Sequence, residues 1–290
     1  AVARSRLWGL TVTAATLISM AATYVASRVL DHDPWSYTWL LPAGGVVAVL
    51  SILILAQSPL RGKYKLENEA IEVNVRQVVV QPILSFIELL KRDRLFFHFE
   101  LAFFLYGMAL MLLFPVMPYF MVDAALMNYE QAGIASGILA QVGVVALSPL
   151  WGRLMDRSGP VRLCAIIFAL LSTFPAILLC GLHYAGSFPL YLAVYGGYLV
   201  FGCAMAGINV AWSLGPVHFA GSADASGYSG AHVTITGIRG MIAPITGAIV
   251  LKYLGYEPVF IASMALFLLG SAGMLVISRR QHRGFYSAAR

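Results

Sequence analysis

Long apolar runs dominate the chain and are separated by short polar segments. Eight of these runs are long enough to cross a hydrocarbon core, which takes about 20 residues of helix. They occupy approximately residues 7–30, 39–59, 95–122, 132–151, 161–183, 189–219, 227–254 and 258–278. Backbone polar groups in lipid must be satisfied within their own segment, so the pattern predicts an all-α polytopic membrane protein with eight transmembrane helices rather than barrel strands, which are shorter and alternating.

The composition agrees with this pattern. Of the 290 residues, 60% are hydrophobic and only 11% are charged, whereas soluble chains carry about 25% charged residues. We therefore expect a lipid bilayer to surround the protein and to contact most of its surface. Cys164, Cys180 and Cys203 all fall inside predicted spans, where we interpret them as small packing residues rather than disulfide partners.

The distribution of basic residues predicts the orientation. With eight spans both termini lie on one side, and 16 of the 19 Lys and Arg residues fall in the termini or loops of that side. The positive-inside rule then places both termini in the cytoplasm, in a plasma membrane of the bacterial type. The basic residues are spread over membrane-flanking loops rather than gathered on one soluble face, so the pI of about 9.3 gives no reason to expect nucleic-acid binding.

The longest polar stretch divides the chain into three parts. Residues 1–60 hold two spans, residues 61–94 form a linker, and residues 95–290 hold six spans. The later part of the linker, 81–94, places apolar and charged residues at helical spacing. This spacing fits a helix on the cytoplasmic membrane surface, and it fits equally an amphipathic extension of the next span.

A faint repeat runs through the last six spans. Pro149 and Gly152 recur 95 residues later as Pro244 and Gly247. A unit of three spans that occurs twice must point its two copies in opposite directions, because three is odd. The spacing therefore favours inverted three-helix repeats within a six-helix bundle.

The strongest motif lies between the fourth and fifth spans. It reads Gly-Arg-Leu-Met-Asp-Arg-Ser-Gly-Pro-Val-Arg from Gly152 to Arg162. We expect Gly152 to allow close helix approach, Asp156 to accept hydrogen bonds at a helix end from donors such as Arg157 and Arg162, and Gly159 to form a tight turn. A charge cluster of this kind can close one side of a protein in one state and release it in another. The alternative is a basic loop that obeys topology, with Asp156 as a helix cap.

This segment resembles the cytoplasmic motif of the major facilitator superfamily, Gly-x-Leu-x-Asp-Arg-x-Gly-Arg-Arg. Pro160 and Val161 stand in place of the usual basic pair, and Arg162 follows them. The resemblance implies that the eight spans correspond to family helices five to twelve, with the first four family helices absent. It also implies that the motif is a conformational gate and that the first, third, fourth, sixth and seventh spans line a central cavity.

Polar groups inside spans are candidate site residues, because they are costly to bury in lipid. Arg239 lies near the middle of the seventh span, where it could hold an anionic solute or a mobile carboxylate. It could equally reach the cytoplasmic surface or lock two helices together. The other candidates for the cavity, each with core packing as the alternative, are Asn209, Trp212, Gln141, Tyr195 and Tyr198.

Titratable groups near the cytoplasmic ends of spans suggest a link to protons. Glu100 is a candidate proton relay, with a surface ion pair to Arg92 or Arg94 as the alternative. His218 and His232 flank an uncharged loop, where they could sense pH or simply be solvated.

We therefore expect secondary active transport of a small solute by alternating access, coupled to a proton or ion gradient. A non-transporting receptor or scaffold with the same fold is the second hypothesis, and a membrane-embedded enzyme is the third. The sequence contains no phosphate-binding loop, no metal-ligand motif and no nucleophile elbow, so we predict no cofactor, no metal and no enzymatic activity.

Overall fold

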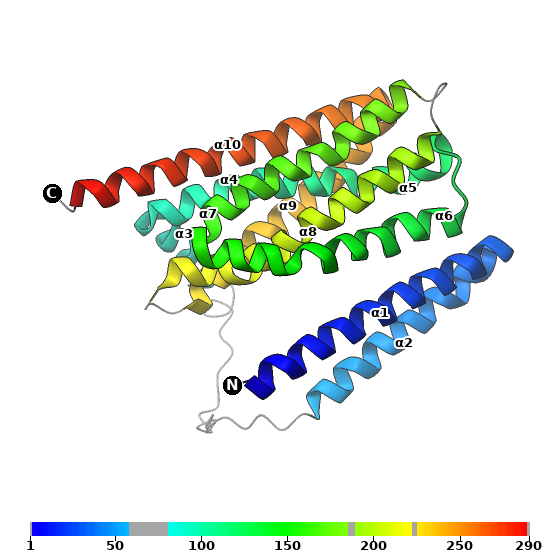
Figure 1. The fold of residues 1–290 in the computed structure, drawn as a ribbon, viewed down its shortest axis with the longest axis horizontal. Coiled ribbons are helices and arrows are strands. Elements are labelled where there is room, and N and C mark those ends of the chain that lie inside the picture. Colours follow the sequence, from blue (N-terminus) through cyan, green and yellow to red (C-terminus); the bar gives the residue numbers. More distant parts are fainter. Residues whose placement is uncertain (1, 58–80, 185–188, 222–224, 289–290) are drawn as a thin grey trace.

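The computed structural model describes residues 2–57, 81–184, 189–221 and 225–288. All regular elements in these ranges are helices, so the predicted all-α class is confirmed for this part of the chain. The helices form a six-helix bundle and a separate hairpin of two helices, and the two chain ends lie toward the same end of the molecule (Figure 1).

The N-terminal hairpin consists of α1 (Val2–His32), the 3-10 turn η1 (Pro34–Ser36) and α2 (Tyr37–Ala56). Asp33 starts the turn by accepting a hydrogen bond from the Trp35 backbone N–H at 3.0 Å. None of the residues of α2 is buried. Because these residues are almost all apolar, lipid or other apolar protein surface must cover them.

A short helix, α3 (Gln81–Arg92), precedes the bundle and is distinct from α4 (Arg94–Leu113). Asp93 separates them with a non-helical backbone, φ −105° and ψ 87°, and its carboxylate caps α4 by accepting from the Phe96 backbone N–H at 2.9 Å. The same carboxylate accepts from the Tyr228 hydroxyl at 3.0 Å. A non-helical residue thus separates the helix at the end of the linker from α4.

The bundle elements run back and forth along the long axis of the molecule, between its two ends (Figure 1). They are α4, α5 (Val116–Tyr119), the π-helical turn η3 (Phe120–Ala124), α6 (Tyr129–Gly133), the π-helical turn η4 (Ile134–Leu139), α7 (Ala140–His183), α8 (Leu190–Ala220), α9 (Ala225–Leu254) and α10 (Tyr256–Ala288). The third predicted span is broken after Leu113, where Pro115 precedes α5.

Helix α7 contains two of the predicted spans. Its backbone reverses direction at Gly159, which has φ 71° and ψ 175°, and the two arms of α7 run in opposite directions (Figure 1). A positive φ is accessible to glycine at little cost. The predicted turn at Gly159 is therefore confirmed. Helical residues directly flank Gly159, so no separate loop joins the two spans.

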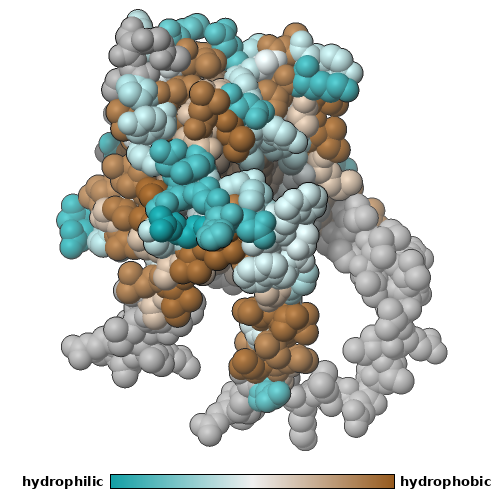
Figure 2. Space-filling model, turned by 90° about the vertical axis from the view of Figure 1, so that its right-hand side faces the viewer, coloured by the Kyte–Doolittle hydropathy of each residue, from teal (hydrophilic) through white to brown (hydrophobic). Residues whose placement is uncertain are grey.

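Aromatic side chains fill the bundle core. Phe96, Phe99 and Phe103 follow one another at helical spacing on α4 and are fully buried, as are Phe168 of α7 and Phe267 of α10. Much of the outer surface is apolar. Seen from the end away from the chain termini, the molecule has brown apolar flanks and polar residues gathered in the middle (Figure 2). This is the surface expected of a protein surrounded by lipid.

Six helical segments among the described residues are long and apolar enough to cross a membrane. One of them, Tyr129–His183, holds the two spans that meet at Gly159, and α1 is not among the six. Six candidates are thus established, while the count of eight crossings stays a prediction.

Candidate functional site

A buried ion pair joins α4 to α9 in the bundle. His232 Nδ1 lies 2.8 Å from one carboxylate oxygen of Glu100 and 3.1 Å from the other, and both side chains are only 2% exposed. Trp212 and Phe103 pack against the His232 ring at centroid distances of 4.3 Å and 4.8 Å. Water is therefore excluded from the pair, and attraction between the charged forms is strong in such surroundings.

These positions differ from two interpretations of the sequence. Glu100 faces His232 rather than forming a surface ion pair with Arg92 or Arg94. His232 is buried rather than solvated. Both groups lie in the part of the bundle where α4, α8 and α9 meet, so the carboxylate proposed as a proton relay has a titratable partner that the sequence did not reveal.

Arg239 lies on α9, seven residues beyond His232, and is 3% exposed. Its guanidinium donates to the Phe103 backbone carbonyl at 2.7 Å. The rings of Phe103, Tyr106 and Trp212 surround it, with centroids 5.6 Å, 5.6 Å and 5.8 Å from Cζ. The alternative in which Arg239 reaches the surface is wrong, and the contact to the α4 backbone is the one expected of a side chain that locks two helices.

The guanidinium of Arg239 lies directly against Gly107, in space that a side chain there would fill. A Cβ atom at Gly107 would collide with Arg239 Cζ, Nη1 and Nε. Arg239 Nε and His232 Nε2 are both buried without a hydrogen-bond partner among the described residues. The cluster therefore contains two buried nitrogen atoms without a hydrogen bond to a described residue, whereas most buried polar atoms in protein cores have a partner.

Of the predicted cavity residues, only Trp212 lies with Arg239. Tyr198 packs in a separate aromatic group with Phe174 and Phe201, and Tyr195 packs on Tyr191. Asn209 is exposed and Gln141 is partly buried. The predicted set is therefore divided among different parts of the bundle.

Sequence reasoning missed three members of the cluster, Phe103, Tyr106 and Gly107, and it gave His232 only as a histidine beside an uncharged loop. A signal for them exists, because Glu100, Phe103 and Gly107 follow at spacings of three and four and so share one face of α4. His232 and Arg239 are seven residues apart and share one face of α9 in the same way.

The predicted gate motif lies at the turn of α7. Asp156, Arg157 and Arg162 are exposed, and within the described ranges none of them forms a hydrogen bond or ion pair through its side chain. The turn is anchored by Trp151, whose indole N–H donates to the Cys203 carbonyl at 2.7 Å. A Cβ on Gly152 would meet no atom within 4 Å, so the expected close approach of a helix at this position is not seen.

The C-terminal end of α1 contacts the first turn of α6 through polar groups. We call this contact the clamp, and its residues are Tyr24, Arg28, Asp31, Tyr129 and Glu130. Arg28 donates to Glu130 at 2.8 Å and the Tyr24 hydroxyl donates to Glu130 at 3.2 Å. The two oxygens of Asp31 accept from the backbone N–H groups of Tyr129 and Glu130, at 2.7 Å and 2.8 Å. A carboxylate from α1 thus caps the N-terminus of α6, where the helix dipole favours negative charge.

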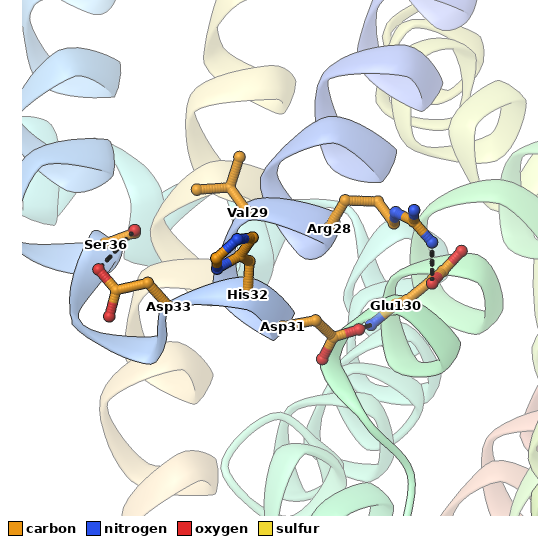
Figure 3. Close-up of a pocket in the computed structure, with 7 residues that line it drawn as sticks. All are labelled: Arg28, Val29, Asp31, His32, Asp33, Ser36 and Glu130. Carbon is orange, nitrogen blue, oxygen red and sulfur yellow. Dashed lines mark hydrogen bonds and ion pairs between the residues drawn. The ribbon is translucent and has the colours of Figure 1, made fainter.

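The clamp borders a pocket of about 540 Å³ between α1, η1 and α6 (Figure 3). Beyond α6, α1 also lies against η4, because a Cβ on Gly137 would lie 2.9 Å from Thr23 Cβ.

The arrangement offers no evident metal centre. Within the described ranges, no group of three or more His, Cys, Asp or Glu side chains is placed to hold a metal ion. The cluster places a carboxylate and an imidazole in hydrogen-bond contact, with the buried guanidinium of Arg239 on the same face of α9 as His232.

Comparison with known families identifies the chain. The sequence model of the Major Facilitator Superfamily matches residues 2–235 and, in a second overlapping match, residues 99–289. The chain belongs to the Major Facilitator Superfamily. The resemblance carried by the motif at 152–162 is thereby confirmed, and the protein is an integral membrane transporter of this superfamily. Neither the curated proteins nor the solved structures gave a significant match.

Proposed function

We propose that the protein is a secondary active transporter that moves a small solute by alternating access. In the described state it is closed at the clamp and open at the gate motif. The observation that carries this proposal is the one-sided contact of α1 with the bundle. Its contacts are concentrated on α6 and η4, and the ribbons of α1 and the bundle diverge toward the other end (Figure 1).

The electrostatics of the two ends support this assignment. The clamp pair is in contact with solvent, with side-chain exposures of 59% for Arg28 and 25% for Glu130, and ion pairs at the surface contribute little to stability. At the other end Asp156, Arg157 and Arg162 are exposed and available for a partner. Closing the motif end while opening the clamp end exchanges one set of polar contacts for another, as a two-state switch requires.

The orientation follows the charge distribution. We propose eight crossings with both termini and the gate motif in the cytoplasm of a plasma membrane of the bacterial type. Residues 1–60 then form the end of an N-terminal bundle, 61–94 a linker, and 95–290 the C-terminal bundle. Gly159 and Gly255, which open the corresponding turns of the two proposed inverted repeats, have positive φ of 71° and 85°, and this match supports the repeat.

The coupling ion proposed here is a proton, taken up by the Glu100 and His232 pair. This pair is buried next to Arg239, so any change in its protonation alters the charge balance of a water-excluded cluster. Arg239 ties α4 to α9 and links that charge to helix packing. Asn209 and Gln141 stay candidates for contact with the solute.

A reversible cross-link between α1 and η4 tests the mechanism. Thr23→Cys combined with Gly137→Cys, with Cys180 replaced by serine, places two thiols at the contact between α1 and η4. The bridge requires α1 and η4 to separate slightly, because Cβ atoms in a disulfide lie about 3.5–4.5 Å apart. In vesicles screened with a library of small solutes, we expect oxidation to stop uptake and a reducing agent to restore it, while the Thr23→Cys single variant keeps its activity. Uptake that persists with the cross-link formed would contradict movement at the clamp end.

The same assay separates transport from a scaffold role. A scaffold would give no solute uptake in either the oxidised or the reduced protein. In the transporter, Glu100→Gln should abolish the dependence of uptake on a proton gradient while solute exchange continues. Loss of both would assign Glu100 to structure or solute binding rather than to the proton.

A further inference from the structure

An apolar groove lies on the outside of the bundle between α3, α4 and α9. Its volume is about 240 Å³, and six of its seven lining residues are apolar. The groove is lined by Leu90 of α3, by Phe97, Glu100, Leu101 and Phe104 of α4, and by Ile235 and Ile238 of α9. Leu101, Phe97 and Ile238 are among the exposed apolar side chains of the bundle.

Basic residues stand at one end of this groove. Lys91 and Arg92 close α3 and Arg94 begins α4, so they flank Leu90 and the first turn of the groove. All three are exposed. Lys91 and Arg94 form no ion pair within the described ranges, so two cations lie beside an apolar channel without an acidic partner.

The dimensions match one leaflet of a bilayer. From Arg94 to Phe104 an α-helix rises about 15 Å, which is half of a hydrocarbon core of about 30 Å. The cations therefore lie at the depth of lipid headgroups when the apolar part of the groove lies beside acyl chains. Helix α3 carries exposed Leu84 and Ile87 and ends in basic residues, as helices at an anionic membrane surface do.

We propose that the groove binds an anionic phospholipid from the leaflet at the end where the chain termini lie. Its phosphate contacts Lys91 and Arg94, and one acyl chain lies along Phe97, Leu101 and Ile238. Charge complementarity selects an anionic headgroup over a zwitterionic one. The inference rests on the position of the protein in a membrane and is independent of transport.

Bound lipid also has a consequence for the buried cluster. Glu100 borders the groove while it pairs with His232 on its inner side. The acyl chain then forms the outer wall of the Glu100 and His232 pair. The lipid occupies a position where it keeps water away from this pair from the membrane side.

Native mass spectrometry of the detergent-purified full chain tests the proposal. The probes are phosphatidylglycerol and phosphatidylcholine of the same chain length. We expect Lys91→Gln with Arg94→Gln to weaken phosphatidylglycerol binding by about 25-fold, from about 1 kcal/mol for each basic residue, with little effect on phosphatidylcholine. Ile238→Trp, which fills the groove without changing charge, should also weaken phosphatidylglycerol binding.

The matched control replaces the exposed pair Arg279 and Arg280 of α10 by glutamine, because this pair lies at the same end of the bundle away from the groove. The control variant should bind phosphatidylglycerol like the unchanged protein. An equal loss in the control and in the Lys91 and Arg94 variant would overturn the site in favour of general attraction to a basic surface. Full binding by the Ile238→Trp variant would overturn the groove as the place of the acyl chain.

Discussion

Two ion pairs in this protein have the same length and opposite surroundings. The distance is 2.8 Å both between His232 and Glu100 and between Arg28 and Glu130. The first pair is 2% exposed on both sides and lies under Trp212 and Phe103. The second joins α1 to α6 at the edge of an open pocket (Figure 3).

The comparison shows that burial decides what an ion pair can do. Removing one partner of a buried pair leaves a charge without compensation, which is strongly destabilising. An exposed pair exchanges its partner for water at little cost. We therefore expect the Glu100 and His232 pair to contribute to holding α4 and α9 together, and the contacts of the clamp to contribute little to stability.

The largest effect is expected from Glu100→Ala. This change leaves His232 and Arg239 buried without a counter-charge, and we expect a loss of stability of about 3–5 kcal/mol. The unfolding midpoint of the purified protein measures this loss. It is followed with a thiol-reactive dye in a background with Cys180 and Cys203 replaced by serine, so that the dye reports exposure of buried Cys164.

Glu257→Ala is the control, because it removes an exposed pair with His183 at 3.5 Å and should change the midpoint little. Combining Glu100→Ala with His232→Ala should cost less than the sum of the single changes, since the two residues contact each other. Additive costs would argue that the pair carries no coupling energy.

A smaller effect is expected from Gly107→Ala. The added methyl group collides with the Arg239 guanidinium, and overpacking of this kind costs about 1–3 kcal/mol. The same unfolding measurement detects it. Gly196→Ala on α8 is the matched control, since a Cβ there meets no atom within 4 Å, and it should leave stability unchanged or slightly raised. Equal unfolding midpoints for the two variants would show that the close contact between Gly107 and Arg239 does not contribute to stability.

Glu130→Gln should leave stability almost unchanged and alter the conformational balance. It removes the charge that Arg28 and Tyr24 contact, and exposed contacts of this type contribute little to folding. We expect faster labelling of a cysteine placed at Thr23, because the clamp end opens more often. Asn128→Ala, which removes the local cap of α6 and keeps the clamp charges, distinguishes clamp opening from fraying of α6. Unchanged labelling in Glu130→Gln would remove the clamp from the mechanism.

The smallest effect on stability is expected from Asp156→Asn, within about 0.5 kcal/mol, because the side chain is exposed and contacts no other side chain within the described ranges. Its effect should fall on solute uptake, which we expect to be slower while membrane insertion is unchanged. Unchanged uptake would contradict the gate and favour the alternative, a basic loop in which Asp156 caps a helix.

The sequence located part of the site because single residues carried the signal. Arg239 and Trp212 stood out as polar or aromatic groups inside apolar runs, and Glu100 as an acid near a helix start. His232 was noticed as a titratable residue, but its neighbours gave no sign that α9 buries it against Glu100 of α4. Gly107 was unrecognisable for the same reason, since its importance lies in the Arg239 side chain that fills the space above it.

What the sequence determined by itself was the solvent, the helices, the turn at Gly159 and the family. These depend on local composition and on a short contiguous motif, because each apolar run must satisfy its own backbone hydrogen bonds in lipid. The tertiary structure alone decided which charges are buried and which are exposed. Glu100 meets His232 across 132 positions of sequence and Arg28 meets Glu130 across 102. The packing of distant helices sets the water content around each pair, and therefore its strength and its role.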